Sequence, residues 1–189
     1  MRKRLEIRFL ELSDYLVWKE AYENQSSPRN DWDHSHRKSD TSKKAFKKYL
    51  KNNNEQRKID RAYYYGIFEK KTGALVGFIM AMDVVRGITQ TAFLGYVLFN
   101  NYWGQGYMQE AIKSFYQIAF KDLGLHRLQA GIEPHNKRSL KVAKALGFRR
   151  EGLSKNIIFL RGEWQDLVQF AITCEDVGIK WKGKATKNY

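Results

Sequence analysis

The chain has 189 residues, with 34 Lys and Arg against 20 Asp and Glu, which gives a formal net charge of +14. Its 43% hydrophobic and 14% aromatic residues are enough to build a core, which excludes a disordered tail and the collagen-like, coiled-coil and mucin-like classes. No apolar run of about 18 residues occurs, so we expect no membrane-spanning helix. Cys174 is the single cysteine, which excludes an intrachain disulfide framework and a cysteine-based zinc site.

The length and the lack of a linker predict one domain. The chain has only two prolines and no Gly/Ser-rich spacer, and one domain is the default at this size. We assign residues 1–178 to that domain and 179–189 to a basic C-terminal tail. Glu6 and Arg8 interrupt the apolar stretch that a signal peptide would need, so we expect a cytoplasmic protein without a membrane partner.

The N-terminal half predicts a strand, two helices and three further strands. Residues 5–10 alternate like a half-buried strand, and a helix follows to about Tyr22. The polar residues 24–40 predict a long loop, and Thr41–Leu50 predicts a short amphipathic helix. Three β-rich runs then predict an antiparallel meander: Tyr63–Glu69, Leu75–Val84 and Thr89–Phe99.

The C-terminal half predicts two helices and three strands. A period of 3.6 begins at Tyr107, and the chain ends in a hairpin around a glycine turn at Arg161–Glu163. The predicted elements are a helix at 107–123, a strand near 128–132, a helix at 139–146 and strands at 156–160 and 166–173. The whole order is β-α-α-β-β-β-α-β-α-β-β, which predicts a mixed α/β domain.

The positive charge is concentrated in three segments. Arg37–Arg61 carries a net +7, Lys137–Lys155 a net +6 and Ile179–Tyr189 a net +4. Concentrated positive charge attracts phosphates, either on a nucleic acid or on a phosphorylated cofactor. For any one segment, a solvated helix face is the alternative explanation.

One candidate site lies where a strand enters a helix through a glycine turn. Gly104 and Gly106 allow close backbone approach, and the first N–H groups of the following helix favour an anion. No third glycine and no Gly-Lys-Ser/Thr follow, so this is neither a dinucleotide fingerprint nor a Walker loop. A plain strand-to-helix turn is the alternative.

A second candidate site lies at the next strand-to-helix junction. Asn136 and Ser139 place two short polar side chains near the start of the helix, on the side of the strand end. Simple helix capping by Asn136 is the alternative.

Together these segments resemble the GNAT N-acetyltransferase family. The resemblance covers nearly the whole chain and implies the GNAT-like acyl-CoA N-acyltransferase fold. It is carried by Trp103-Gly104-Gln105-Gly106-Tyr107-Met108, Glu110-Ala111, Asn136-x-x-Ser139 and Ala145-Leu146-Gly147-Phe148. Further strings are similar to the RimJ-type ribosomal-protein-alanine N-acetyltransferases: Val84-Val85-Arg86-Gly87, Leu94-Gly95-Tyr96, His126-Arg127, Pro134-His135-Asn136-Lys137-Arg138-Ser139 and Gly162-Glu163-Trp164-Gln165-Asp166.

The resemblance implies acetyl-CoA as co-substrate and no metal. The pyrophosphate would lie on the N–H groups of Gly104–Met108, and the pantetheine would pair with a strand end that separates from its neighbour at Gly95. The implied cofactor-binding residues are Tyr96, Val97, Leu98, Trp103, Gly104, Gln105, Gly106, Tyr107, Met108, Asn136 and Ser139. Trp103 and Met108 depart from the Arg or Gln and the Gly or Ala that the family motif has there, which bears on affinity.

The catalytic residues implied by the resemblance are Ser139, Glu110 and Asp166. Ser139 would protonate the departing thiolate. A weak base, or a water relaying to one, would suffice for the amine, and the two carboxylates are the candidates. Glu110 has a structural alternative within the first helical turn, and Asp166 has one in pinning the hairpin. Glu133 also ends a strand near the expected thioester. A metal held by Asp31, Asp33, His34 and His36 is a minor alternative.

We expect acetyl transfer to the α-amino group of a protein N-terminus, that of a ribosomal protein beginning with Ala or Ser. The acceptor would enter between the 24–40 loop and the Arg161–Trp164 turn. One alternative is a small amine, a polyamine or an aminoglycoside, although a +14 chain repels a cationic acceptor. The other is a ribosome- or RNA-binding module with a vestigial site, using the basic segments and Trp181 or Tyr189. We expect a monomer or a homodimer.

Overall fold

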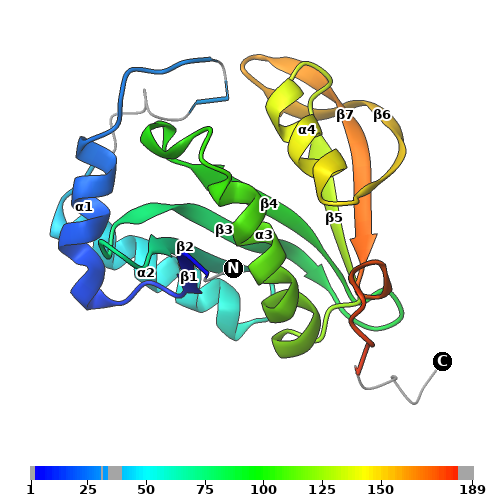
Figure 1. Cartoon of the computed structure of the whole chain (residues 1–189), viewed down its shortest axis with the longest axis horizontal. Helices are drawn as coiled ribbons and strands as arrows, with labels where there is room; N and C mark the ends of the chain where they lie inside the picture. The colour runs from blue at the N-terminus through cyan, green and yellow to red at the C-terminus, as the bar shows by residue number, and fades with distance from the viewer. Residues whose placement is uncertain (1–2, 31, 34–39, 183–189) are drawn as a thin grey trace. The chain divides into compact units, whose positions relative to one another are not determined.

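The computed structural model describes residues 3–30, 32–33 and 40–182, and its helices and strands follow the expected order (Figure 1). The mixed α/β class is confirmed. The elements are β1 (Leu5–Arg8), α1 (Tyr15–Glu23), α2 (Lys43–Lys58), β2 (Tyr63–Glu69), β3 (Leu75–Val85), β4 (Thr91–Leu98), α3 (Tyr107–Gln117), β5 (Arg127–Ile132), α4 (Lys137–Ala145), β6 (Arg149–Leu160) and β7 (Glu163–Thr173). Within the described ranges, no helix is long and apolar enough to span a membrane.

The strands form one seven-stranded mixed sheet in the order β1-β2-β3-β4-β5-β7-β6. β1 pairs antiparallel with β2, and β7 pairs antiparallel with both β5 and β6. β4 and β5 are parallel. Because parallel neighbours need a crossover connection, α3 lies between them in the chain, as the predicted order required.

The chain divides into two compact units. Unit 1 comprises Met1–Met80 and Tyr96–Ser114, and unit 2 comprises Ala81–Gly95 and Phe115–Tyr189. The boundaries fall inside β3, β4 and α3.

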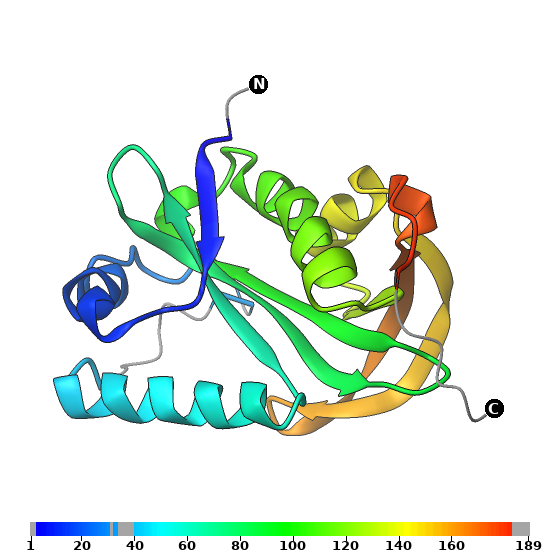
Figure 2. The same ribbon diagram turned by 90° about the horizontal axis from the view of Figure 1, so that it is seen from below.

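Unit 1 has an aromatic core beneath α1 and α2. Trp18 and Phe46 lie 4.9 Å apart between ring centroids, and both are buried with Phe68, Phe78 and Phe99. In Figure 2, α2 runs along one face of the strands of this unit while the first turns of α3 lie on the other face. The sequence therefore folds this unit by burying its large aromatic side chains between helices and sheet.

The helix α2 is longer than its apolar pattern predicted. It ends at Lys58 instead of Leu50, although its last two turns have no apolar stripe. Arg57 explains the extension, because its guanidinium lies 4.2 Å from the centroid of the Phe9 ring and packs this part of the helix onto the core. Lysine side chains on the opposite side stay exposed, which matches the predicted amphipathic face.

Unit 2 consists mainly of the β6–β7 hairpin, β5 and α4, and Figure 1 shows α4 alongside β5 and β7. The hairpin turns at Arg161 and Gly162, whose φ angles of 54° and 84° are the two positive values of a two-residue primed turn. β6 begins at Arg149, well before the predicted residue 156. Most of β6 is exposed on both faces, so it lacks the alternation by which a half-buried strand is recognised.

Within unit 2, β4 and β5 stop pairing after three residues. The parallel register runs from Thr91 with Arg127 to Phe93 with Gln129. Leu94 and Gly95 still belong to β4, but among the described residues they have no register partner on β5, which continues beside β7 to Ile132. Pairing with β5 therefore ends at Phe93, two residues before Gly95, where the resemblance placed the separation. Backbone N–H and C=O groups of β4 become available at this edge of the strand.

Gly77 permits the close approach of β3 to the end of β4 in unit 1. A Cβ at this position would lie 2.2 Å from the carbonyl oxygen of Val97 and 2.9 Å from the Cα of Leu98. Both contacts are with backbone, which cannot move aside as a flexible side chain can. The position therefore requires glycine for reasons of space.

We predict that Gly77→Ala lowers the free energy of unfolding by about 1–3 kcal/mol, the usual cost of overpacking a tight site. Urea denaturation followed by circular dichroism measures it. The matched control is Gly152→Ala in β6, because a Cβ there meets nothing within 4 Å. Equal stabilities of the two variants would contradict the prediction.

Candidate active site

The glycine turn of unit 1 has the conformation of an anion-binding turn. Gly104 and Gly106 adopt φ angles of 80° and 75°, in the left-handed region that favours glycine. Helix α3 begins at Tyr107, and its first backbone hydrogen bond runs from the Glu110 N–H to the Gly106 carbonyl at 3.2 Å. The N–H groups before Glu110 have no acceptor within the helix, so they can bind an anion.

Arg4 and Glu110 fasten the N-terminal strand to this turn. The Glu110 carboxylate accepts the backbone N–H of Arg4 at 2.6 Å and that of Leu5 at 3.2 Å, and it accepts Arg4 Nε at 2.8 Å. Partial burial alone would raise the pKa of the Glu110 carboxyl, but these hydrogen bonds and the Arg4 charge lower it below its ordinary value. The contacts support the structural alternative for Glu110, and its role as a base stays a prediction.

Arg4 also covers one side of the turn. Its Nη2 donates to the Gln105 carbonyl at 3.1 Å, and its guanidinium lies 4.5 Å from the centroid of the Tyr107 ring. Sequence reasoning missed this residue because it lies about one hundred positions away from the motif. No local pattern signalled it.

The described part of the 24–40 loop is attached to the segment that precedes the turn. Asn100 is 1% exposed and its amide donates to the carbonyl of Ser26 at 2.7 Å and to Oδ2 of Asp33 at 3.1 Å. Asp31, His34 and His36, part of the alternative metal cluster, lie outside the described residues. Asp33 is 3% exposed and its carboxylate accepts the Arg29 N–H at 2.8 Å, so the described part of that cluster serves the loop backbone.

The end of β4 and Trp103 are linked in unit 1. Tyr96, Val97 and Leu98 are half-buried, and the Leu98 carbonyl accepts the indole N–H of Trp103 at 3.0 Å. Trp103 is thereby fixed against the strand end. The buried side chains of Tyr107 and Met108 hold the first turn of α3.

In unit 2, α4 begins as a capped helix. Asn136 Oδ1 accepts the N–H of Ser139 at 3.2 Å, and the Asn136 N–H donates to the Glu133 carbonyl at 2.9 Å. This is the capping that was the alternative for Asn136. The amide N–H₂ of Asn136 and the hydroxyl of the half-buried Ser139 remain the groups predicted to meet the co-substrate.

Each of two acidic candidates in unit 2 has a cationic partner. Glu133 is 9% exposed and forms a bidentate ion pair with Arg161 at the hairpin turn. Asp166 accepts Lys155 Nζ at 2.7 Å and the Asn156 N–H at 2.9 Å, and the Lys155 hydrogen bond is the main reason why its pKa is lowered. The register of the hairpin shifts between Ser154 and Ile158, so Asp166 pins a bulge, as its structural alternative supposed.

The same hairpin exposes a patch of large apolar side chains. Phe159 and Trp164 pair across the strands with ring centroids 5.6 Å apart, and they are 58% and 59% exposed. Leu153, Ile157 and Ile158 of the same strand as Phe159 are also exposed, at 42%, 51% and 37%. A concentration of this kind on one hairpin is typical of a surface that contacts another macromolecule.

A group of possible metal ligands in unit 2 was not expected from the sequence. The ligand atoms of His126, Cys174 and Glu175 lie within 4.8 Å of one another. Burial raises the pKa of the Cys174 thiol to about 11, and the thiol donates to Glu175 at 3.2 Å. A metal would have to displace that proton, so we assign the group to holding the end of β7, where the Cys174 N–H also bonds the His126 carbonyl at 3.0 Å.

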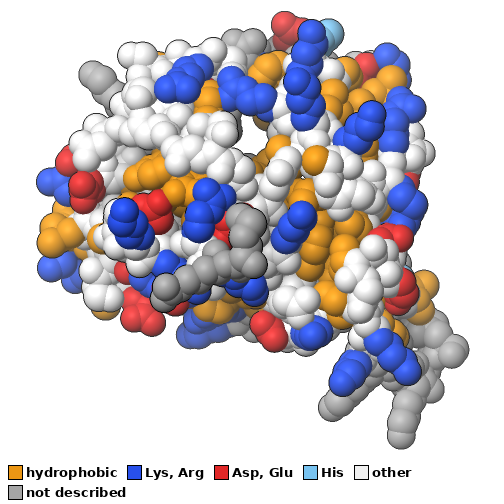
Figure 3. Space-filling model, in the orientation of Figure 1, with side chains coloured by type: hydrophobic (Ala, Val, Ile, Leu, Met, Phe, Trp, Pro, Cys, Tyr) orange, Lys and Arg blue, Asp and Glu red, His pale blue; other side chains and the backbone are white. Residues whose placement is uncertain are grey.

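The described part of the basic tail packs onto unit 2. Trp181 donates its indole N–H to the Gly124 carbonyl at 3.1 Å, and its ring stands edge-on to His126. The indole proposed for stacking on RNA is therefore engaged within the protein, while Tyr189 lies outside the described residues. In Figure 3, Lys and Arg side chains are dispersed over the drawn face and do not form one patch.

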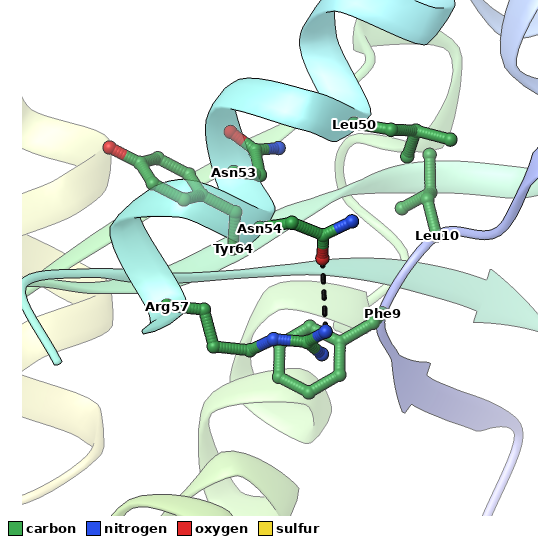
Figure 4. A pocket seen from close by; sticks show the side chains of 7 residues that line it. All are labelled: Phe9, Leu10, Leu50, Asn53, Asn54, Arg57 and Tyr64. Carbon is green, nitrogen blue, oxygen red and sulfur yellow. Dashed lines mark hydrogen bonds between the residues drawn. The ribbon is translucent and has the colours of Figure 1, made fainter. Parts of the chain in front are cut away.

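A small pocket in unit 1 shares no residue with the predicted site. It is lined by Phe9, Leu10, Leu50, Asn53, Asn54, Arg57 and Tyr64 (Figure 4). Arg57 lies over Phe9 and donates to Asn54 Oδ1 at 2.9 Å, so this arginine covers the pocket. We assign it no substrate role.

Comparison with known proteins decides the family. Residues 4–149 match the family model described as "Acetyltransferase (GNAT) domain". The chain belongs to the GNAT acetyltransferase family. GNAT acetyltransferases use acetyl-CoA. The binding of its pyrophosphate by the glycine turn stays a prediction.

Two curated relatives are N-acetyltransferases. The probable N-acetyltransferase YjcK of Bacillus subtilis is 36% identical over 122 residues, which cover 65% of this chain and 67% of that protein. The ribosomal protein uS5-alanine N-acetyltransferase of Escherichia coli is 34% identical over 123 residues, which cover 65% of this chain and 63% of that protein. The matched stretch thus spans about two thirds of these relatives.

Solved structures share the fold of this GNAT chain. A ribosomal-protein-S5-alanine acetyltransferase from Vibrio fischeri has a TM-score of 0.75 at 24% identity over 96% of this chain and 97% of its own. Mycobacterium smegmatis RimJ in complex with CoA-disulfide has a TM-score of 0.76 at 23% identity, covering 92% and 84%. A spermidine N-acetyltransferase SpeG variant from Vibrio cholerae has 0.69 at 18%, covering 93% and 97%. Fold alone therefore leaves the acceptor open.

The Glu110 contacts give a testable pH dependence. Because the pKa of Glu110 is lowered in the folded protein, its ionised carboxylate stabilises the fold at pH values above the ordinary carboxyl pKa of 4.5. This stabilisation is lost as the pH falls through the lowered pKa. We predict that Glu110→Gln costs about 1 kcal/mol at pH 7 and progressively less below pH 4. Urea denaturation at several pH values measures it. Glu163→Gln, at the exposed start of β7, is the control, and a loss independent of pH would contradict the prediction.

Proposed function

We propose that this GNAT enzyme transfers an acetyl group from acetyl-CoA to the α-amino group of a protein N-terminus, that of a ribosomal protein beginning with Ala or Ser. The observation that carries the proposal is the match to the uS5-alanine N-acetyltransferase of Escherichia coli, 34% identical over 123 residues. The Pro134–Ser139 string, the most specific part of the resemblance, begins α4 and includes its N-cap.

The exposed hairpin patch supports a macromolecular acceptor. Phe159 and Trp164 present aromatic area that a small polycation does not need, and aromatic side chains are enriched where proteins contact one another. The net charge of +14 acts in the same direction, because it slows the approach of a polyamine and attracts an anionic ribosomal surface.

Backbone groups would hold much of the donor. In unit 1, the N–H groups from Gly104 to Met108 would receive the pyrophosphate. The end of β4, which stops pairing with β5 after Phe93, would offer backbone partners for an extended pantetheine chain near Tyr96–Leu98. Asn136 would contact the cysteamine end.

Deprotonation of the acceptor amine needs no strong base from the protein. An α-amino group has a pKa near 7.7–8.0, against about 10.4 for lysine, so a useful fraction is neutral at pH 7. Its nitrogen attacks the thioester carbonyl, the C–S bond breaks, and the amine proton leaves through water. The carbonyl oxygen gains negative charge during attack, which a backbone N–H near Val97 or Leu98 would stabilise.

The departing thiolate needs a proton, and Ser139 is the proposed donor. Its hydroxyl would protonate the sulfur and then regain a proton from solvent. Glu110, Glu133 and Asp166 each form an ion pair with a cationic side chain, so their carboxylate oxygens are engaged in structural contacts. These ion pairs agree with deprotonation of the amine by water.

The first test of this proposal is a thiol-release assay with acetyl-CoA and three acceptors. We expect turnover of a peptide that begins with Ala to exceed that of spermidine and of an aminoglycoside by at least tenfold in kcat/KM. The same peptide with an acetylated N-terminus is the control for lysine acetylation. Preferred turnover of spermidine would contradict the protein acceptor and support a small amine instead. Absence of turnover with all three acceptors would support the vestigial-site alternative.

The second test concerns Ser139. We predict that Ser139→Ala lowers kcat by about 100-fold or more, the usual contribution of a positioned general acid. Ser139→Cys retains an acidic proton and should restore part of the rate. Steady-state kinetics from pH 6 to pH 9 measure both, and an unchanged kcat of the alanine variant at every pH would refute the role.

A further inference from the structure

The 24–33 part of the loop in unit 1 is held by one buried side chain. Asn100 donates to the carbonyls of Ser26 and Ser27 at 2.7 and 3.1 Å, and its Oδ1 accepts the Ser26 N–H at 3.0 Å. Asn101 adds hydrogen bonds to Ser26 and to the carbonyl of Asn24. Loop backbone that forms no helix or strand thus finds its partners on the segment just before the glycine turn.

Asp33 extends this attachment to Arg29. Its Oδ2 accepts both an N–H of the Asn100 amide, at 3.1 Å, and the backbone N–H of Arg29, at 2.8 Å. The carboxylate is 3% exposed, so these contacts form in a region of low dielectric where hydrogen bonds are strong. The backbone of Arg29 is therefore fixed relative to Asn100.

The side chain of Arg29 extends from the loop to the residue that begins the glycine turn. Its guanidinium lies 5.7 Å from the centroid of the Trp103 ring, and Trp103 begins the turn. The ring itself is fixed by the hydrogen bond from its N–H to the Leu98 carbonyl. A guanidinium over an aromatic face keeps its N–H groups directed outward in its own plane, where they can donate to an anion.

Two arginines from distant parts of the chain thus lie at the turn. They differ in whether a carboxylate of the protein pairs with the guanidinium. Arg4 forms an ion pair with Glu110 at 2.8 Å. Arg29 is exposed, and within the residues that the structure describes no carboxylate oxygen lies within 4.0 Å of its guanidinium nitrogens. Arg29 is thus the arginine whose charge remains to be matched by a ligand.

We infer that Arg29 binds the pyrophosphate of CoA, and that Asn100 and Asp33 are positioning residues that present it. The inference rests on the proposed use of acetyl-CoA. It adds a bidentate, charge-assisted donor to a turn otherwise made of backbone N–H groups. It also makes the loop residues that Asn100 and Asp33 hold part of the donor site, so that co-substrate binding and the position of the expected acceptor wall depend on each other.

The test is isothermal titration calorimetry with CoA and with dephospho-CoA, which retains the pyrophosphate but lacks the 3′-phosphate. We expect Arg29→Ala to weaken both ligands by the same factor, about tenfold or more, and Arg29→Lys to weaken them less. Arg61→Ala, an exposed arginine of the same unit outside the loop, is the matched control and should bind both ligands as the parent does.

The outcomes separate this inference from the proposed function. A parent protein that does not bind CoA contradicts both. A parent that binds CoA, with an Arg29→Ala variant of equal affinity, overturns the role of Arg29 alone. A loss seen with CoA and absent with dephospho-CoA would assign Arg29 to the 3′-phosphate and overturn the pyrophosphate assignment.

Charge swapping tests the positioning residues. Asn100→Asp removes the amide donors and brings a second carboxylate to Asp33, so we expect it to weaken CoA about as much as Arg29→Ala. Adding Asp33→Asn should restore part of the affinity. If the residues act through Arg29, combining Asn100→Asp with Arg29→Ala gives no further loss. Additive losses, or a full loss of folding in circular dichroism for both the single and the swapped variant, would refute positioning.

Discussion

The arrangement of unit 1 around the glycine turn depends on the hydrogen bonds of one buried carboxamide, the side chain of Asn100. A polar loop of this length has many backbone groups and little apolar surface, so it cannot be positioned by hydrophobic burial. Asn100 supplies both donors and an acceptor at once, and Asp33 carries the connection to Arg29. Without it, the loop carbonyls would have to return to water, and the guanidinium over Trp103 would lose its fixed support.

Three described carboxylates that were candidate bases each pair with a cationic side chain. Glu110 holds Arg4, Glu133 holds Arg161, and Asp166 holds Lys155. Each pair joins segments that are separate in the sequence or pins a bulge, so these acids are occupied by structural contacts. The proposed acceptor, an α-amino group, is already partly neutral at pH 7 and so needs little from these carboxylates.

Much of the fold could be predicted because its elements carry local patterns. The helix from Tyr107 has a 3.6-residue period, and the meander strands have β-rich runs between turn residues, so their bounds were nearly right. The predicted bounds are less accurate where tertiary contacts, and not a local hydrophobic pattern, determine where an element begins or ends. α2 continues to Lys58 because Arg57 packs on Phe9, and β6 starts early because an exposed edge strand has no alternation. Trp181 packs on unit 2, which no tail composition indicated.

For the site, the sequence alone determined the glycine turn, the Asn136–Ser139 helix start and the family, since short contiguous motifs fix local backbone conformation. Only the tertiary structure decided which distant side chains serve them. Arg4 and Arg29 meet the turn from positions about one hundred and about seventy-five residues away, and no period or spacing encodes such meetings. The fold brings those residues together because burying the apolar core fixes the path of the chain, and polar contacts then form among the groups that this path leaves adjacent.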